Sequence, residues 1–131
     1  MKWCLILVIV LAGCGWNAEA PVDDVALLIT QWVHDTIEYE AMPEWQTPAY
    51  TLETGTGDCV NMVLLAMDML HDMGIHSVMI AGYYDGKPHG WLGVNGEWYE
   101  VTAGIRIYDR SLYEVEYYVT RGQAIVFEIV I

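Results

Sequence analysis

The spacing of apolar residues changes once along this chain, and that change limits the possible folds more than any other feature. Residues 22–37 and 58–74 repeat apolar side chains every three to four positions, which is typical of amphipathic helices. From Ser77 onward, short β-rich runs predict strands at 77–84, 90–94, 97–102, 112–119 and 124–131. Helices followed by strands indicate an α+β domain, in which a helix pair packs on an antiparallel sheet.

Turn and helix-end residues refine these limits. Pro21, followed by two aspartates, suits the first turn of the first helix, and Gly74 suits the C-terminal end of the second. Asn95-Gly96 is a strong signal for a two-residue hairpin. The chain over 38–56 is predicted to be irregular, because it contains the breakers Pro43, Pro48 and Gly55.

The first 13 residues have the features of a bacterial export signal. Lys2 precedes an apolar run, Leu5 to Leu11, which is too short to span a membrane as a helix. The run ends in Leu11-Ala12-Gly13-Cys14, which resembles the lipobox at which a lipoprotein signal is removed and the cysteine is acylated. An ordinary secretory signal and a buried N-terminal strand are the alternatives.

The expected organisation follows from this leader. We interpret residues 1–13 as a lipoprotein signal peptide, 14–21 as anchor and linker, and 22–131 as one domain with room for a single core. The domain is expected to be exported and lipid-anchored to a bacterial membrane, facing the periplasm or the cell surface.

The charge balance narrows the choice of partners. Eighteen acidic residues face five basic ones, and the formal net charge is −13. Nucleic acids and anionic lipid surfaces bind basic patches, so this balance argues against both. A basic substrate is permitted, although surface acids often only keep a protein soluble. We expect a peptide or protein substrate, and contact with the membrane through the lipid; the oligomeric state stays open.

Loss of the leader and acylation of Cys14 would leave Cys59 without a partner for an intrachain disulfide. Cys59 stands at the predicted start of the second helix, where unpaired backbone N–H groups and the helix dipole favour a thiolate. It can instead be a small buried apolar side chain, and Asp58 before it a simple N-cap.

Of the four histidines, His89 is the one expected near this thiol. His71 lies three turns further along the same predicted helix, and His76 follows the opposite end of that helix. His34 belongs to the first helix and is interpreted as a solvated or a hydrogen-bonded histidine. His89 opens a strand after a turn, on an edge that can return to the helix start.

Several short motifs occur in an order and spacing that together are specific, although each alone is weak. Before the cysteine stand Trp45-Gln46-Thr47-Pro48, Thr51-Leu52 and Gly57-Asp58-Cys59; after it stand Gly74-Ile75, His89-Gly90-Trp91 and Gly96-Glu97-Trp98-Tyr99. In this arrangement, over about residues 22–104, the chain resembles the bacterial transglutaminase-like cysteine peptidases. The three tryptophans of these motifs are interpreted as core or cleft wall.

The resemblance implies a papain-like core and a thiol hydrolase for peptide or isopeptide bonds. Cys59 would attack an amide carbonyl to form a thioester, and His89 would take and return the proton. It also makes Gln46 a candidate for binding the oxyanion with the Cys59 backbone N–H; a loop amide bonded to the backbone is the equal alternative. A non-catalytic binding lipoprotein and a protein-glutamine acyltransferase are the alternative functions.

One position departs from the family pattern. Where the family usually has an Asp, after its Gly-x-Trp-Tyr motif, this chain has Thr102. A two-residue turn at Asn95-Gly96 would put His89 opposite Thr102, with Glu100 on the diagonal and within reach of the ring. We predict that Glu100 supplies the charge that orients His89. The alternative is that the Thr102 hydroxyl alone holds the ring.

The sequence contains no recognisable metal-ligand spacing, calcium loop or phosphate loop, so we expect neither metal nor cofactor.

We predict that Cys14 carries lipid, because it follows the apolar run at the lipobox position. In a bacterial host fed a labelled fatty acid, the wild-type chain should carry label in the membrane fraction, and Cys14→Ser should carry none. Equal labelling of the two chains would refute the prediction.

Overall fold

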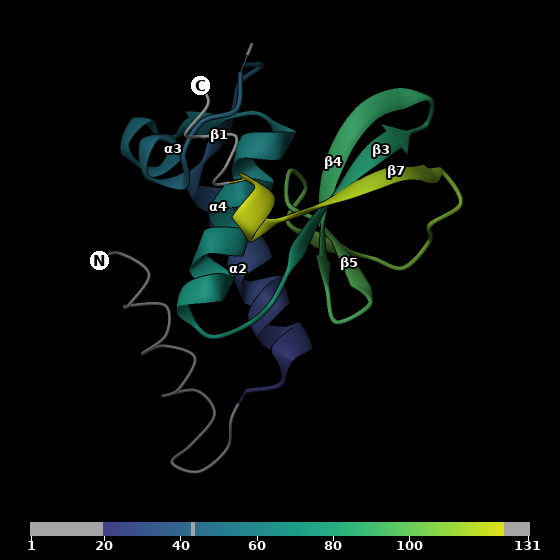
Figure 1. Ribbon diagram of the computed structural model, residues 1–131, viewed down its shortest axis with the longest axis horizontal. Coiled ribbons are helices and arrows are strands. Elements are labelled where there is room, and N and C mark those ends of the chain that lie inside the picture. The colour runs from purple at the N-terminus through teal and green to yellow at the C-terminus, as the bar shows by residue number, and fades with distance from the viewer. Residues whose placement is uncertain (1–19, 43, 125–131) are drawn as a thin grey trace.

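The computed structural model describes residues 20–42 and 44–124, and it confirms the α+β class. Three helices lie wholly within the described residues, and Figure 1 shows them on one side of an antiparallel sheet. The helices are α2 (Val22–Thr36), α3 (Pro48–Thr54) and α4 (Cys59–Asp72). The sheet has the strand order β6-β5-β4-β3-β7. Its strands are β3 (Val78–Tyr84), β4 (Lys87–Val94), β5 (Glu97–Glu100), β6 (Ile105–Ile107) and β7 (Tyr113–Thr120).

The main core lies between the helices and the sheet. The apolar stripes predicted for α2 and α4 are buried there, as Val33 and Leu70 show with no exposed surface. They meet sheet residues such as Met79 and Leu92. Burial of one such aliphatic side chain contributes about 1.5–3 kcal/mol. Among the described helices, none combines the length and apolar character that crossing a bilayer requires.

The prediction of irregular chain over 38–56 is wrong in part, because this segment contains α3. The Thr47 side chain caps the helix by accepting a hydrogen bond from the Tyr50 backbone N–H at 3.1 Å. Pro48, read as a breaker, is the first helical residue, where its missing N–H costs nothing. The helix is followed by Gly55, whose φ of 71° favours glycine.

A short parallel pair then leads into α4. Strand β1 (Glu38–Tyr39) lies beside β2 (Thr56–Gly57), with Tyr39 opposite Gly57. The backbone N–H of Glu40 also donates to the Gly57 carbonyl at 2.9 Å. These contacts hold the chain immediately before Cys59, so the start of α4 is braced from a distant segment.

The predicted hairpin at Asn95-Gly96 is confirmed, with Val94 opposite Glu97 and both turn residues at positive φ. The predicted strand 97–102, however, ends at Glu100. The chain then turns, and the N–H of Gly104 bonds back to the Glu100 carbonyl at 2.8 Å. Thr102 therefore lies in this turn and is not paired with His89 in the sheet. The following short strand, β6, was not predicted, because three residues give no clear alternation.

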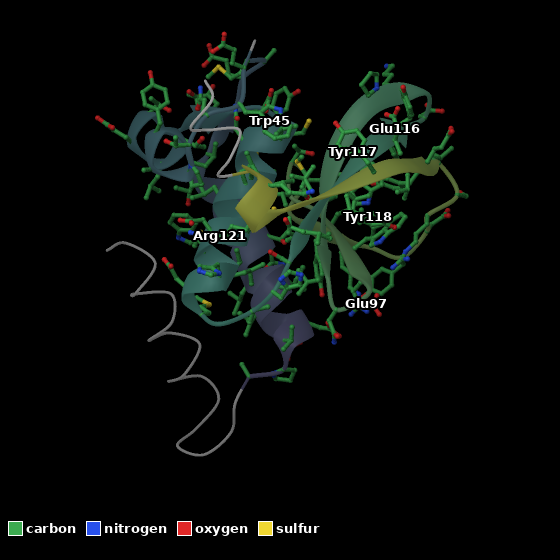
Figure 2. All side chains as sticks on the ribbon, in the orientation of Figure 1. Trp45, Glu97, Glu116, Tyr117, Tyr118 and Arg121 are labelled. Atoms are coloured by element: carbon green, nitrogen blue, oxygen red, sulfur yellow. The ribbon has the colours of Figure 1, made fainter. Side chains whose placement is uncertain are left out.

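The edge strand β7 approaches β3 closely at a bulge near Gly82. Beyond its end, Arg121 binds Asp68 of α4 at 3.1 Å and ties the edge of the sheet to the helix layer. Figure 2 shows Arg121 against α4. Residues 121–124 are helical, so Ala124 is not in the strand predicted for 124–131. The rest of that prediction lies outside the described residues.

We predict that Gly82→Ala destabilises the fold by about 3 kcal/mol, because the added Cβ would overlap the Glu114 carbonyl oxygen of β7. Gly122→Ala is the matched control, since a Cβ there has nothing closer than the Thr120 hydroxyl at 4.0 Å. Urea denaturation of the two variants measures the difference. Equal stability of both would contradict the close approach at the bulge.

Candidate active site

Cys59 is the first residue of α4, as the sequence predicted. Asp58 caps this helix, because its carboxylate accepts a hydrogen bond from the Asn61 backbone N–H at 3.0 Å. Cys59 is a free thiol and is partly exposed, unlike a cysteine sealed in the core. The backbone N–H groups of a first helical turn have no partner within the helix, so the sulfur stands where a negative charge is stabilised.

His89 lies between this thiol and the end of β5. Burial lowers the pKa of the imidazole, but hydrogen bonds to Cys59 and Glu100, together with their charges, outweigh it and raise the pKa from 6.5 to about 9. The Nε2 atom contacts Glu100, so Nδ1 is the ring nitrogen left for the sulfur. The imidazole can therefore be held as a cation beside the thiol.

Glu100 contacts the histidine with both carboxylate oxygens. The distances from His89 Nε2 are 2.8 Å to Oε1 and 2.9 Å to Oε2. Because a carboxylate only accepts, Nε2 carries the proton. The side chains are 18% and 9% exposed, so water screens this pair weakly. The structure thus places Glu100 within reach of His89, as the sequence predicted, although the β4–β5 pairing ends at Leu92 opposite Tyr99 and does not extend to the His89–Thr102 pair from which the diagonal was counted.

Two hydroxyl groups also bind this carboxylate. Thr102 donates to Oε1 at 2.9 Å, and Tyr113 donates to Oε2 at 2.9 Å. The Thr102 hydroxyl therefore bonds Glu100, whereas the sequence register had placed it across from the His89 ring. Tyr113 was missed by sequence reasoning. It starts the edge strand β7, and nothing local in the sequence connects it to Glu100.

Gln46 lies beside the start of α4. Its backbone N–H donates to Asn61 Oδ1 at 2.7 Å, and its side-chain Oε1 accepts from the Thr51 hydroxyl at 3.2 Å. Asn61 is fully buried in the first turn of α4 and Thr51 belongs to α3. The side-chain oxygen is thus engaged by α3, which leaves the amide NH₂ as the donating end.

The other histidines are separate from this site. His34 Nδ1 bonds the Thr102 carbonyl at 2.9 Å, so it holds the turn after β5 and its hydrogen bonding is satisfied, one of the two interpretations made from the sequence. His71 and His76 are exposed at the far end of α4. The tryptophans fit the core or wall interpretation: Trp91 is fully buried and Trp45 packs against the main core.

Tyr39 is a second residue that sequence reasoning missed. Burial raises the pKa of its phenol, and the nearby charges of Cys59 and Asp58 raise it further. The residue is 58% exposed and belongs to β1, which pairs with the strand immediately before Asp58 and Cys59. Within residues 20–42 and 44–124, no group of three or more His, Cys, Asp or Glu side chains lies together as a metal site would require.

The comparisons with known proteins agree with this geometry. The model of the transglutaminase-like superfamily matches residues 14–118, and the chain belongs to that superfamily. Among curated proteins, no sequence match was found.

Solved structures share the fold at low sequence identity. LapG of Legionella pneumophila superposes with a TM-score of 0.71 at 12% identity, over 98% of this chain and 86% of that chain. Its calcium-bound form gives 0.67 at 13% identity, over 88% and 69%. A candidate cysteine protease from Cytophaga hutchinsonii gives 0.53 at 17% identity, over 91% of this chain and 47% of its own. The TM-scores show that these proteins share the fold of this chain, and identities this low show the fold alone.

We predict that His89 titrates near pH 9 and that Glu100→Gln moves this titration to lower pH, because one source of the raised pKa is removed. The protonated form is the one that Glu100 stabilises, so loss of the charge favours proton release. NMR titration of ¹³C-labelled histidine in the full chain measures both values. A His89 signal that titrates at the free-histidine value of about 6.5 would contradict the proposed contacts.

Proposed function

We propose that this chain is an exported, lipid-anchored thiol hydrolase that cleaves peptide or isopeptide bonds. Cys59 is the nucleophile, His89 the general base and acid, and Glu100 the acidic residue that orients the histidine. One observation carries this proposal: His89 Nε2 contacts the Glu100 carboxylate at 2.8 Å, and Cys59, at the start of α4, is close enough to raise the pKa of the same imidazole. The cysteine-protease candidate of the same fold supports the reaction class.

In the first step the thiolate sulfur attacks the carbonyl carbon of an amide, and the carbonyl oxygen takes the negative charge. Protonated His89 gives its Nδ1 proton to the leaving amine as the C–N bond breaks. A thioester on Cys59 remains. The contact with Glu100 stabilises the imidazolium before the transfer and keeps the ring aimed at the sulfur.

The oxyanion requires donors on the side of the sulfur away from the histidine. The backbone N–H of Cys59 is one donor, because it belongs to the first turn of α4. The NH₂ of Gln46 is the second, since Thr51 fixes the opposite end of that amide. Such donors act without reorganisation when the charge develops.

In the second step water attacks the thioester carbon while neutral His89 takes a proton from it. The C–S bond then breaks, the acid leaves, and the thiolate–imidazolium pair is restored. In the alternative acyltransferase an amine takes the place of water, and in the alternative binding protein neither step occurs. The same residues would serve the hydrolase and the transferase.

The test uses the purified full chain and a complex peptide library. New N-termini that depend on Cys59, and are absent with Cys59→Ser, indicate hydrolysis. A labelled primary amine added to the same reaction is incorporated only if acyl transfer competes with water. A chain that yields neither product, although Cys59 reacts readily with iodoacetamide, would overturn the proposed hydrolase.

Within this test Glu100→Gln should lower turnover by about tenfold to a hundredfold, because a hydrogen bond to a charged group is lost. Thr102→Val should lower it less, by about threefold, since its hydroxyl reaches only Glu100. Glu97→Gln is the matched control, because Glu97 lies on the same strand and pairs with Arg106 at the surface. A silent Glu100→Gln beside an inactive Thr102→Val would assign the orienting role to Thr102.

A further inference from the structure

Glu100 needs support that its own strand does not supply. A glutamate side chain has three torsions, and this one ends β5 immediately before a turn. Yet both of its oxygens lie within 2.9 Å of one imidazole nitrogen. An ionised carboxylate that is almost buried also requires hydrogen-bond donors to offset its lost hydration. Its position must therefore be fixed by neighbours.

We propose that Tyr113 is a positioning residue that holds the Glu100 carboxylate on His89; the inference rests on the proposed function. The Tyr113 hydroxyl donates to Oε2 at 2.9 Å, and the Thr102 hydroxyl donates to Oε1. With each oxygen held by a different donor, the carboxylate cannot rotate away from the ring without breaking a hydrogen bond to a charged group.

The Tyr113 ring is itself held firmly. It packs edge-on against Trp91, with ring centroids 4.9 Å apart. It also lies tilted against Tyr84, with ring centroids 4.7 Å apart. Trp91 has no exposed surface, and Tyr113 packs against the small core around it. The close approach of β7 to β3 at Gly82 keeps the start of this strand near the site. These packing contacts fix the position of the Tyr113 hydroxyl.

The phenol also stays in the form that can donate. Burial raises the pKa of Tyr113, and the charge and hydrogen bond of Glu100 raise it further. The hydroxyl therefore keeps its proton throughout the range in which a protein is active. Thr102 is anchored from another direction, because its carbonyl accepts from His34 of α2. One carboxylate oxygen is therefore held from the helix layer, through Thr102 and His34, and the other is held from the edge strand by Tyr113.

The test measures the rate at which iodoacetamide alkylates Cys59 in the full chain at neutral pH, with the product followed at its own peptide. Tyr113→Phe keeps the ring and removes the donor, so the rate should fall about three- to tenfold. Tyr118→Phe is the matched control, since Tyr118 lies on the same strand and is 57% exposed. Figure 2 shows Tyr117 and Tyr118 along β7.

A double-mutant cycle separates positioning from packing. In the Glu100→Gln background, Tyr113→Phe should cost nothing further, because the carboxylate that it positions is gone. Each variant is measured below its own melting transition. The NMR signal of the His89 Nε2 proton gives a second readout, and it should move upfield or broaden in Tyr113→Phe.

The outcomes are distinguishable. If Glu100→Gln leaves alkylation unchanged, the proposed triad itself fails. If Glu100→Gln slows alkylation but Tyr113→Phe matches wild type or is faster, the triad stands and the role of Tyr113 is refuted. Losses that add in the double variant, with an unchanged Nε2 proton signal, would reduce Tyr113 to a packing residue and also overturn the inference.

Discussion

The packing of α4 on β4 at Gly90 brings together the two segments that carry the thiol and the imidazole. A Cβ at Gly90 would meet Val60 Cγ2 at 3.4 Å and Met79 Sδ at 3.5 Å, so the first turn of the helix packs in van der Waals contact with this part of the sheet. Val60 follows Cys59, and Gly90 follows His89. The cores on either side of the sheet hold this arrangement in place.

The acidic group that contacts His89 lies near, but not at, the position where the family resemblance predicted an acid. Glu100 ends β5 two residues before Thr102, and its side chain reaches His89. A glutamate has more torsions to restrain than an aspartate, and a buried carboxylate needs hydrogen-bond donors. Thr102 and Tyr113 supply those donors, one from the following turn and one from the edge strand. The position that lacks the expected acid thus remains in contact with it.

The loop before Cys59 is likewise held by more than one element. Helix α3 fixes the oxygen of the Gln46 amide through Thr51, and α4 holds the Gln46 backbone through Asn61. The β1–β2 pair braces the residues just before Cys59. Three neighbouring segments of the chain therefore converge at one helix start. This convergence fixes the backbone on either side of Cys59.

Some of these features follow from local chemistry, and the sequence alone was enough to predict them. The apolar spacing of α2 and α4, the Asp58 cap and the Asn95-Gly96 turn depend on residues close in the chain, and the structure confirms each. The hairpin register also placed Glu100 near His89, because register is counted outward from the turn. Helix α3 escaped prediction because Pro48 signals a helix start and a break equally well.

What only the tertiary structure decided are the contacts between segments that no local pattern links. The early end of β5 depends on the turn held by His34, 68 residues away from Thr102 in the chain. Tyr113 reaches Glu100 across two strands, because β3 and β4 lie between β7 and β5 in the sheet. Sequence patterns report the face and period of one element, whereas these contacts depend on how separate elements pack. The residue types at the site were therefore readable from the sequence, but the hydrogen bonds that hold them required the assembled fold.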